Sequence, residues 1–171
     1  PGRELLLAMG DRPLLAEDLG FLTPSVRQLL EESGYPGMKV LQFAFDSREG
    51  DESHLPHKYP EYCVAYSGTH DNDTFAGWLA GAPGQDTAYA RAYLRLGQDR
   101  PCWDALCALW ATQARVIIVQ GQDLLALGSD SRMNKPGTLG DNWCWRTKEK
   151  SFTKKIAQDI RGKMELYGRI S

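Results

Sequence analysis

The chain has 171 residues, 42% of them hydrophobic, which is long enough for one domain with a real core. Its 20 basic residues nearly balance 22 acidic ones, without a long block of one sign, so the basic footprint of a nucleic-acid binder is absent. No apolar stretch approaches the roughly 18 residues that span a bilayer, and the first residues do not read as a secretion signal, so we expect neither a nucleic acid nor a membrane as partner.

The first 45 residues predict a strand, a helix and a second strand. Residues 13–17 form a short apolar run, which predicts the first strand. Thr23 and Pro24 then open a helix, because a capping hydroxyl precedes proline at the first helical position, and Gly34 ends it. Residues 38–45 are too short and too rich in aromatic and branched side chains for a helix, so they predict the second strand.

Two further strands are predicted in the rest of the chain. After a loop over residues 46–62, the third strand covers residues 63–66, and a continuous apolar run at 116–119 gives the fourth. The alternation with helices predicts an α/β fold in which helices wrap a parallel sheet, with the chemistry just past the carboxyl ends of the strands. These helices are expected at residues 73–79, 87–96, 102–114 and 156–167.

The cysteines indicate a reducing compartment. They include no CxxC pair, and three of them lie among apolar or aromatic neighbours, where a reduced thiol behaves as a small hydrophobe. We therefore expect a cytoplasmic protein. The sequence begins at Pro1 without an initiator Met, and we expect it to belong to something longer.

Polar groups follow the ends of the predicted strands, namely Glu17-Asp18, Asp46, His70-Asp71 and Asp123. Glu17 has two readings that the sequence leaves open: its carboxylate can cap the following turn, or it can act as a general acid/base. A glutamate desolvated at the mouth of an apolar sheet can hold a proton near neutral pH, which suits the second reading.

The densest cluster is Ala65 to Thr74, "AYSGTHDNDT", directly after the third strand. Asp73 is expected to cap the helix that starts with Thr74, but capping does not explain His70 and Asp71, for which we expect a functional role. With His54 and His57 a metal site is conceivable, but no spacing matches a known ligand motif. A P-loop and a GxGxxG motif are also missing, so we expect neither metal nor cofactor.

Residues 129–146, "SDSRMNKPGTLGDNWCWR", form a turn-rich loop that is unusually aromatic for a surface. Tryptophan faces suit the apolar faces of sugar rings, while asparagine, aspartate and arginine can bind the hydroxyls at ring edges. For Trp143 and Trp145 themselves, anchoring of the loop to the core is an equally open reading.

Six blocks, in order through nearly the whole chain, resemble the C-terminal part of the amylomaltase family, the 4-alpha-glucanotransferases or disproportionating enzymes. The blocks are "LLAEDLG", "GYPGMKVLQFAFD", "LPHKY", "SGTHDNDT", "QDLLALGS" and "RMNKPGT..DNWCWR". Departures are small: Lys58 stands where the family usually has asparagine, and Asp141 where glycine is common. They put details of the glucan groove in doubt, not the class.

The resemblance implies roles for six residues. Glu17 is the general acid/base and Asp71 the third catalytic carboxylate, and with His70 it grips sugar hydroxyls as the ring flattens toward an oxocarbenium ion. Phe43 lines the acceptor side. The remaining two, Asn134 and Pro136, belong to the loop that shapes the groove.

The resemblance also implies a partial (β/α)8 barrel over residues 1–171, with about strands five to eight, acting on alpha-1,4-glucans such as maltodextrins by a retaining double displacement. The family's nucleophile is an aspartate that precedes the AEDLG block, so it lies outside this chain, which we expect to be inactive alone. From the residues themselves we would pair Glu17 as acid with Asp71 as nucleophile; the resemblance overrules that assignment of Asp71.

Two other functions stay open at this point: a glucan-binding module without chemistry, and a metal-dependent hydrolase that uses the histidines. The expected partners are a maltodextrin or another alpha-1,4-glucan, and the N-terminal part of the same enzyme. Without that part, open sheet edges and apolar faces predict self-association.

Overall fold

Three short parallel strands form the sheet of the computed structural model, which describes residues 1–10, 12–20, 22–48 and 51–170. The strands are β1 (Gly37–Val40), β2 (Cys63–Tyr66) and β3 (Val116–Ile118), in the order β1-β2-β3. Their register pairs Val40 with Tyr66 and Tyr66 with Ile118. Parallel strands need long crossovers, and the two crossovers here cover residues 41–62 and 67–115.

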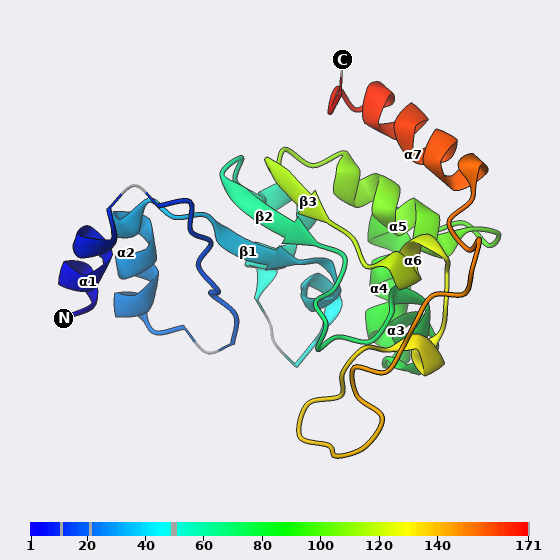
Figure 1. Ribbon diagram of the computed structural model, residues 1–171, viewed down its shortest axis with the longest axis horizontal. Helices are drawn as coiled ribbons and strands as arrows, with labels where there is room; N and C mark the ends of the chain where they lie inside the picture. The colour runs from blue at the N-terminus through cyan, green and yellow to red at the C-terminus, as the bar shows by residue number, and fades with distance from the viewer. Residues whose placement is uncertain (11, 21, 49–50, 171) are drawn as a thin grey trace.

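The α-helices are α1 (Gly2–Met9), α2 (Pro24–Ser33), α3 (Phe75–Gly81), α4 (Gly84–Leu94), α5 (Pro101–Trp110), α6 (Gly121–Leu124) and α7 (Lys154–Leu166). Single 3-10 turns are η1 (Leu41–Phe45), η2 (Glu52–His54), η3 (Pro56–Lys58) and η4 (Ser129–Ser131). In Figure 1, α1 and α2 lie side by side at one end, and the sheet separates them from α3–α7. None of the described helices is long and apolar enough to cross a membrane.

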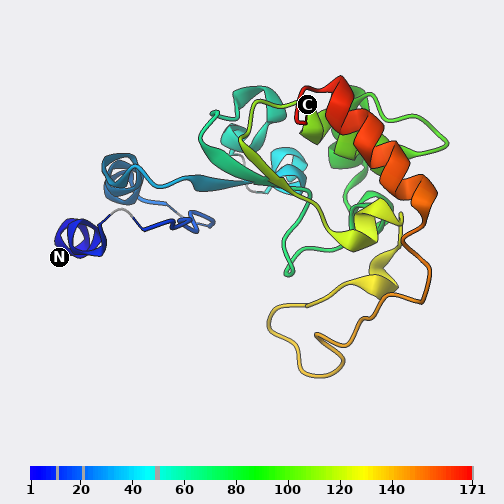
Figure 2. The same cartoon turned by 45° about the horizontal axis from the view of Figure 1, so that its top comes forward.

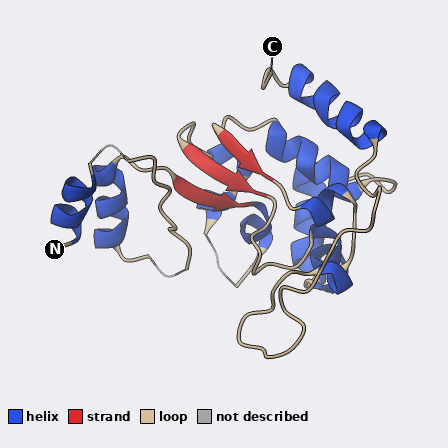
Figure 3. Cartoon of the chain, viewed as in Figure 1, coloured by secondary structure: helices blue, strands red, loops and turns tan. Residues whose placement is uncertain are grey.

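The two faces of the sheet have different surroundings, because successive side chains of a strand point to opposite faces. Cys63 and Ala65 of β2 belong to the buried core, together with side chains from α3, α4 and α5, such as Phe75 and Leu109. On the other face Val116 and Ile118 of β3 are 46% and 48% exposed. The central position of the strands between helices is clear in Figure 3. One apolar face of a parallel sheet is thus partly uncovered, although such sheets are normally covered on both faces.

Local helix signals predicted α2 and α7 correctly. Pro24 is the first residue of α2, and Gly34 ends it in the left-handed region with φ of 67°. The capping hydroxyl expected of Thr23 was wrong: Thr23 Oγ1 lies 3.0 Å from the Ser25 hydroxyl and makes no cap bond to the helix backbone. Thr153 caps α7 by accepting the Ile156 N–H. The helices predicted in the middle of the chain also exist, with boundaries shifted by a few residues, whereas α1 was not predicted.

The prediction of four strands was wrong in two places. Residues 38–45 are a strand only as far as Val40, and the chain then turns as η1, which places Leu41 and Phe45 in the core and brings the Gln42 amide to the Asp73 carbonyl at 2.8 Å. Residues 13–17 are irregular.

The segment around Glu17 nevertheless lies beside the start of β1. The Ala16 N–H donates to the Pro36 carbonyl at 3.0 Å, and the Asp18 carboxylate accepts the Met38 N–H at 2.5 Å. A Cβ at Gly37 would lie 2.5 Å from Asp18 Oδ2, so glycine is needed for this approach. One backbone bond and one side-chain bond fall short of a ladder, which explains why the segment is extended but not a strand.

Candidate functional site

A cavity of about 530 Å³ lies on the uncovered face of the sheet. Met38, Tyr66 and Ile118 contribute one side chain from each strand, and the loop after β2 contributes His70 and Asp71. Its other lining residues are Leu15, Glu17, Leu19, Gly68, Thr69, Val119, Gln120, Gln122 and Met133. Three of the six predicted site residues, Glu17, His70 and Asp71, are therefore brought to one cavity.

The loop after β2 is shaped by a local turn. Asn72 Oδ1 accepts both the N–H and the hydroxyl of Thr69 at 2.8 Å, and the Asn72 N–H donates to the Thr69 carbonyl at 3.1 Å. Asparagine commonly bonds nearby backbone in this way. The two residues inside the turn, His70 and Asp71, are left with side chains 56% and 48% exposed, available to a ligand in the cavity.

The Asp71 carboxylate has two neighbours within the described residues. Asn134 donates its side-chain amide to Asp71 Oδ1 at 2.5 Å, and His70 Nε2 lies 3.4 Å from the same oxygen. Arg132 also donates to the Asp71 backbone carbonyl at 2.5 Å. Asn134, which was predicted to shape the groove, therefore bonds directly to the predicted catalytic carboxylate.

The aromatic loop of residues 129–146 docks on this motif. The Trp143 ring lies 5.0 Å from the His70 ring, and its backbone N–H donates to the Met133 carbonyl at 2.7 Å. Trp143 remains 54% exposed, so it anchors the loop to His70 rather than to the core and keeps a free face. The rest of the loop projects away from the helices in Figure 2, and Pro136 lies in this exposed part, outside the cavity lining.

Glu17 differs from the expectation in one respect. Its neighbours Ala16 and Asp18 are bonded to the entrance of β1, but the Glu17 side chain itself is exposed at the cavity. The described residues of this chain therefore do not supply the desolvation expected for a general acid. The turn-capping alternative is not supported by Asp18, whose carboxylate accepts the N–H of Met38 in β1 and not an N–H of the following turn.

Phe43 does not line the cavity. It lies on η1, with its ring edge-on to His54 at 5.4 Å. Among the other strand-end acids, Asp46 forms an ion pair with Arg48, which together with its hydrogen bonds lowers the pKa of that carboxyl. Neither Asp46 nor Asp123 lines the cavity.

The histidines of the metal hypothesis are otherwise engaged. His54 is buried, and its Nδ1 accepts the Val40 N–H at 3.1 Å. His57 Nδ1 lies 2.7 Å from the Tyr93 hydroxyl. No group of three histidine, cysteine or carboxylate side chains arranged for a metal occurs in the described part of the chain, and a metal-dependent hydrolase has no support from this geometry.

Sequence reasoning missed the buried groups under the motif. Thr74, not Asp73, caps α3, because its hydroxyl accepts the Gly77 N–H at 3.1 Å. Asp73 instead accepts the Thr74 N–H and the Ser129 hydroxyl, each at 2.7 Å. Gln42 and Asp123 also reach this loop from η1 and from α6. The threonine before this apolar helix is a cap signal that could have been recognised in the sequence. The sequence carries no such signal for the distant partners Gln42 and Asp123.

Comparison with known proteins decides the family. The family model described as 4-alpha-glucanotransferase matches residues 3–152. This chain belongs to the 4-alpha-glucanotransferase family. The predicted resemblance is thereby confirmed.

The curated 4-alpha-glucanotransferases cover most of this chain. That of Clostridium butyricum is 42% identical over 166 residues, which are 94% of this chain and 33% of the relative. That of Thermus thermophilus is 44% identical over 160 residues, 85% of this chain and 31% of the relative. The chain thus spans about a third of the length of these relatives.

A solved structure supports the same assignment. The amylomaltase from Streptococcus agalactiae in complex with acarbose is 36% identical, with a TM-score of 0.91 over 98% of this chain and 35% of that chain. The mixed α/β fold with a small parallel sheet therefore matches part of an amylomaltase.

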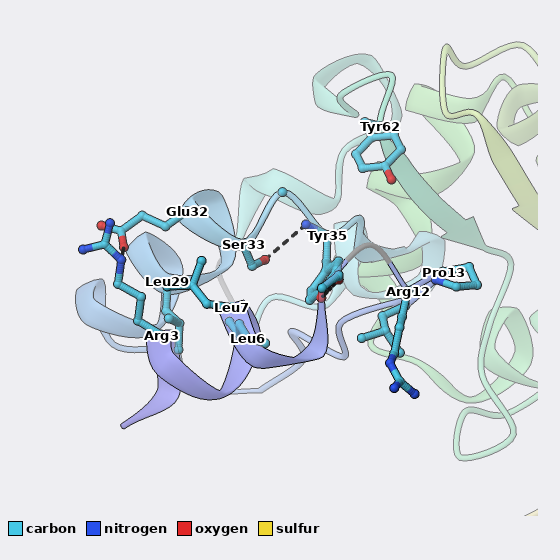
Figure 4. A pocket seen from close by; sticks show the side chains of 13 residues that line it. Arg3, Leu6, Leu7, Arg12, Pro13, Leu29, Glu32, Ser33, Tyr35 and Tyr62 are labelled. Atoms are coloured by element: carbon cyan, nitrogen blue, oxygen red, sulfur yellow. Dashed lines mark hydrogen bonds and ion pairs between the residues drawn. The ribbon is translucent and has the colours of Figure 1, made fainter.

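A larger cavity of about 610 Å³ lies between α1 and α2 and contains none of the predicted site residues. Figure 4 shows its lining, with Arg3 paired to Glu32 on one side and Tyr35 and Tyr62 on the other. The predicted carboxylates Glu17 and Asp71 line the smaller cavity, so the size of a cavity does not by itself single out the predicted site.

Proposed function

We propose that this chain is the part of a 4-alpha-glucanotransferase that carries the general acid/base, Glu17, and the third catalytic carboxylate, Asp71. The observation that carries the proposal is that Glu17, Asp71 and His70 line one cavity in a member of this family. The substrate is an alpha-1,4-glucan such as a maltodextrin. A relative of the same fold is named as a complex with acarbose, which supports a saccharide as ligand.

The reaction is a retaining double displacement. In the first step Glu17 protonates the oxygen of the leaving glucan while a nucleophilic carboxylate forms a covalent bond to the anomeric carbon. In the second step Glu17 removes the proton from the 4-hydroxyl of the acceptor glucan, which attacks the anomeric carbon and releases the carboxylate. Asp71 accepts hydrogen bonds from sugar hydroxyls, and these bonds strengthen as positive charge develops on the ring. Asn134 holds Asp71 Oδ1 at 2.5 Å, which leaves Oδ2 for the sugar.

The three strands and the segment around Glu17 are proposed to be strands five to eight of a (β/α)8 barrel. Two features support this. The segment lies beside the start of β1, so that it and the three strands make four neighbouring chain segments, and one face of the sheet is partly uncovered. In a closed barrel that face is the packed interior, and the active site lies at the carboxyl ends of the strands.

The nucleophile is proposed to come from outside these 171 residues. Three other acids, Asp46, Asp123 and Asp130, do not line the cavity and are no substitutes for the nucleophile, and Asp123 is only 2% exposed. The chain alone is therefore expected to be inactive, and Glu17 is expected to become desolvated only when the remaining part covers it. A cytoplasmic location belongs to the same proposal, and the four unpaired cysteines are compatible with it.

The test is the disproportionation of maltotriose into glucose and maltopentaose, measured on the longer enzyme that contains this chain. Wild type is expected to be active, and Glu17→Gln to lose roughly 10²- to 10⁴-fold in turnover, the usual contribution of general acid–base catalysis. Glu31→Gln on α2 is the matched control and should leave turnover unchanged, because Glu31 does not line the cavity. An inactive wild type that still binds maltodextrin would favour the non-catalytic glucan-binding module.

A further inference from the structure

We propose that Asp123 is a positioning residue that fixes the catalytic loop by bonding both of its ends; this rests on the function proposed above. The loop between β2 and α3 carries His70 and Asp71. Asp123 Oδ2 accepts the hydroxyl of Ser67, the residue that follows β2, at 2.7 Å. Its other oxygen, Oδ1, accepts the N–H of Phe75, the first residue of α3, also at 2.7 Å. One carboxylate thus closes a loop of residues 68–74.

The direction of these bonds requires a carboxylate. Ser67 Oγ accepts the Gln120 N–H at 3.0 Å, which leaves its own proton to point at Asp123. The Phe75 N–H is a fixed donor as well, so both Asp123 oxygens must accept at once. An ionised carboxylate does this, whereas an asparagine would turn an NH2 group toward one of the two donors. Charge-assisted bonds of this kind are short and strong.

Burial makes both hydrogen bonds to Asp123 necessary. Ser67, Phe75 and Asp123 are at most 2% exposed, so none can exchange its partner for water. Burial raises the pKa of Asp123, and the neighbouring Asp73 carboxylate adds to that, while the bonds from Phe75 and Ser67 lower it. Loss of either donor leaves a buried acceptor unsatisfied, which is the costly case.

His70 and Asp71 depend on these ends, because their own contacts outside the turn are to the loop of residues 129–146. Asp71 is about half exposed and is bonded through Asn134, which belongs to the projecting loop. Asp123 and Gln42 hold the ends of the catalytic loop, Gln42 through the Asp73 carbonyl. The middle of the loop is bonded to residues 129–146 instead, where the Asn134 N–H donates to the His70 carbonyl at 3.1 Å and Arg132 donates to the Asp71 carbonyl at 2.5 Å. Asp123 thus sets the position of His70 and Asp71 without touching the substrate.

The first experiment measures turnover in the longer enzyme. Asp123→Asn keeps the volume and is expected to lower kcat for maltotriose by about ten- to a hundredfold with little change in KM, because a displacement of about 1 Å costs that much. Asp46→Asn is the matched control and should leave kcat unchanged, since Asp46 is also a hydrogen-bonded carboxylate but its bonds are to Arg48 and not to the catalytic loop. Ser67→Ala is expected to lower kcat in the same direction, and the double variant to fall no further than Asp123→Asn, since both changes break one network.

A second measurement separates this inference from the proposed function. In the 171-residue chain, Asp123→Asn should shift or broaden the NMR signals of the His70 and Asp71 amides, whether or not the enzyme transfers glucan. If Asp123→Asn does not fold, the same signals are measured in Ser67→Ala. An inactive wild type would overturn the proposed function, but not this result. Unchanged His70 and Asp71 signals, or a folded Asp123→Asn enzyme with normal kcat, would overturn the positioning role.

Discussion

The buried histidine next to the sheet makes the stability of this chain depend on pH in a defined direction. His54 is 7% exposed, and its Nδ1 accepts the Val40 N–H at 3.1 Å, which requires the unprotonated nitrogen. The pKa of His54 is lowered from 6.5 to about 4, mainly by burial and then by the nearby Lys39 ammonium, against smaller opposite effects of Asp51 and Asp18. The folded chain therefore resists protonation at this position.

The sign follows from the two pKa values. Between 6.5 and about 4 the unfolded chain binds a proton at His54 that the folded chain does not, so stability is fully present above 6.5 and is lost as pH falls toward about 4. At about 1.4 kcal/mol per pKa unit, the whole shift amounts to up to about 3 kcal/mol, and about 2 kcal/mol of it is lost between pH 7 and pH 5.

The assay is urea unfolding of wild type and His54→Asn at pH 7, 6 and 5. Asparagine places an acceptor oxygen near the position of Nδ1, so it keeps the bond from Val40 but does not titrate, and the contributions of the carboxylates cancel in the comparison. The free energy of unfolding should fall by about 2 kcal/mol more in wild type than in the variant between pH 7 and pH 5. Parallel pH profiles, or an NMR titration of His54 with a midpoint near 6.5, would refute the reasoning.

Three further outcomes are expected. Asp71→Asn in the longer enzyme should lower kcat for maltotriose more than it weakens ground-state binding, because its bonds to the sugar strengthen in the transition state; equal losses in kcat and affinity would contradict this. Thr74→Ala should destabilise the chain by about 1 kcal/mol in urea unfolding, because it removes the cap of α3, while Thr74→Ser should stay close to wild type; an alanine variant as stable as wild type would exclude the cap as a source of stability. The isolated chain should self-associate through its uncovered apolar face at Val116 and Ile118, and light scattering that finds a stable monomer would argue against this.

The sequence predicted those features whose cause is local. Pro24 and Gly34 set the ends of α2, because proline suits the first helical position and a left-handed glycine ends a helix within one turn. The turn that exposes His70 and Asp71 is also local, since it is closed by residues three positions apart, but it was not predicted.

Features that depend on distant partners were not predictable in this way. An apolar run such as residues 13–17 becomes a strand only when a neighbour bonds it along its length, and here the described neighbour supplies one backbone bond. Asp123 meets Phe75 and Ser67 across 48 and 56 positions, and no spacing rule marks such a pair. The exposure of Glu17 likewise depends on what covers the cavity, not on its own sequence block.

The most direct test of the central claim is to find the residue that carries the sugar during transfer. In the longer enzyme with Glu17→Gln, a maltosyl fluoride donor needs no proton to leave, while the second step lacks its base, so the covalent glycosyl-enzyme should accumulate. Mass spectrometry of the digested protein is predicted to find the sugar on an aspartate outside these 171 residues, with the peptide that contains Asp71 unmodified. A sugar attached to Asp71 would contradict the account and would make Asp71 the nucleophile.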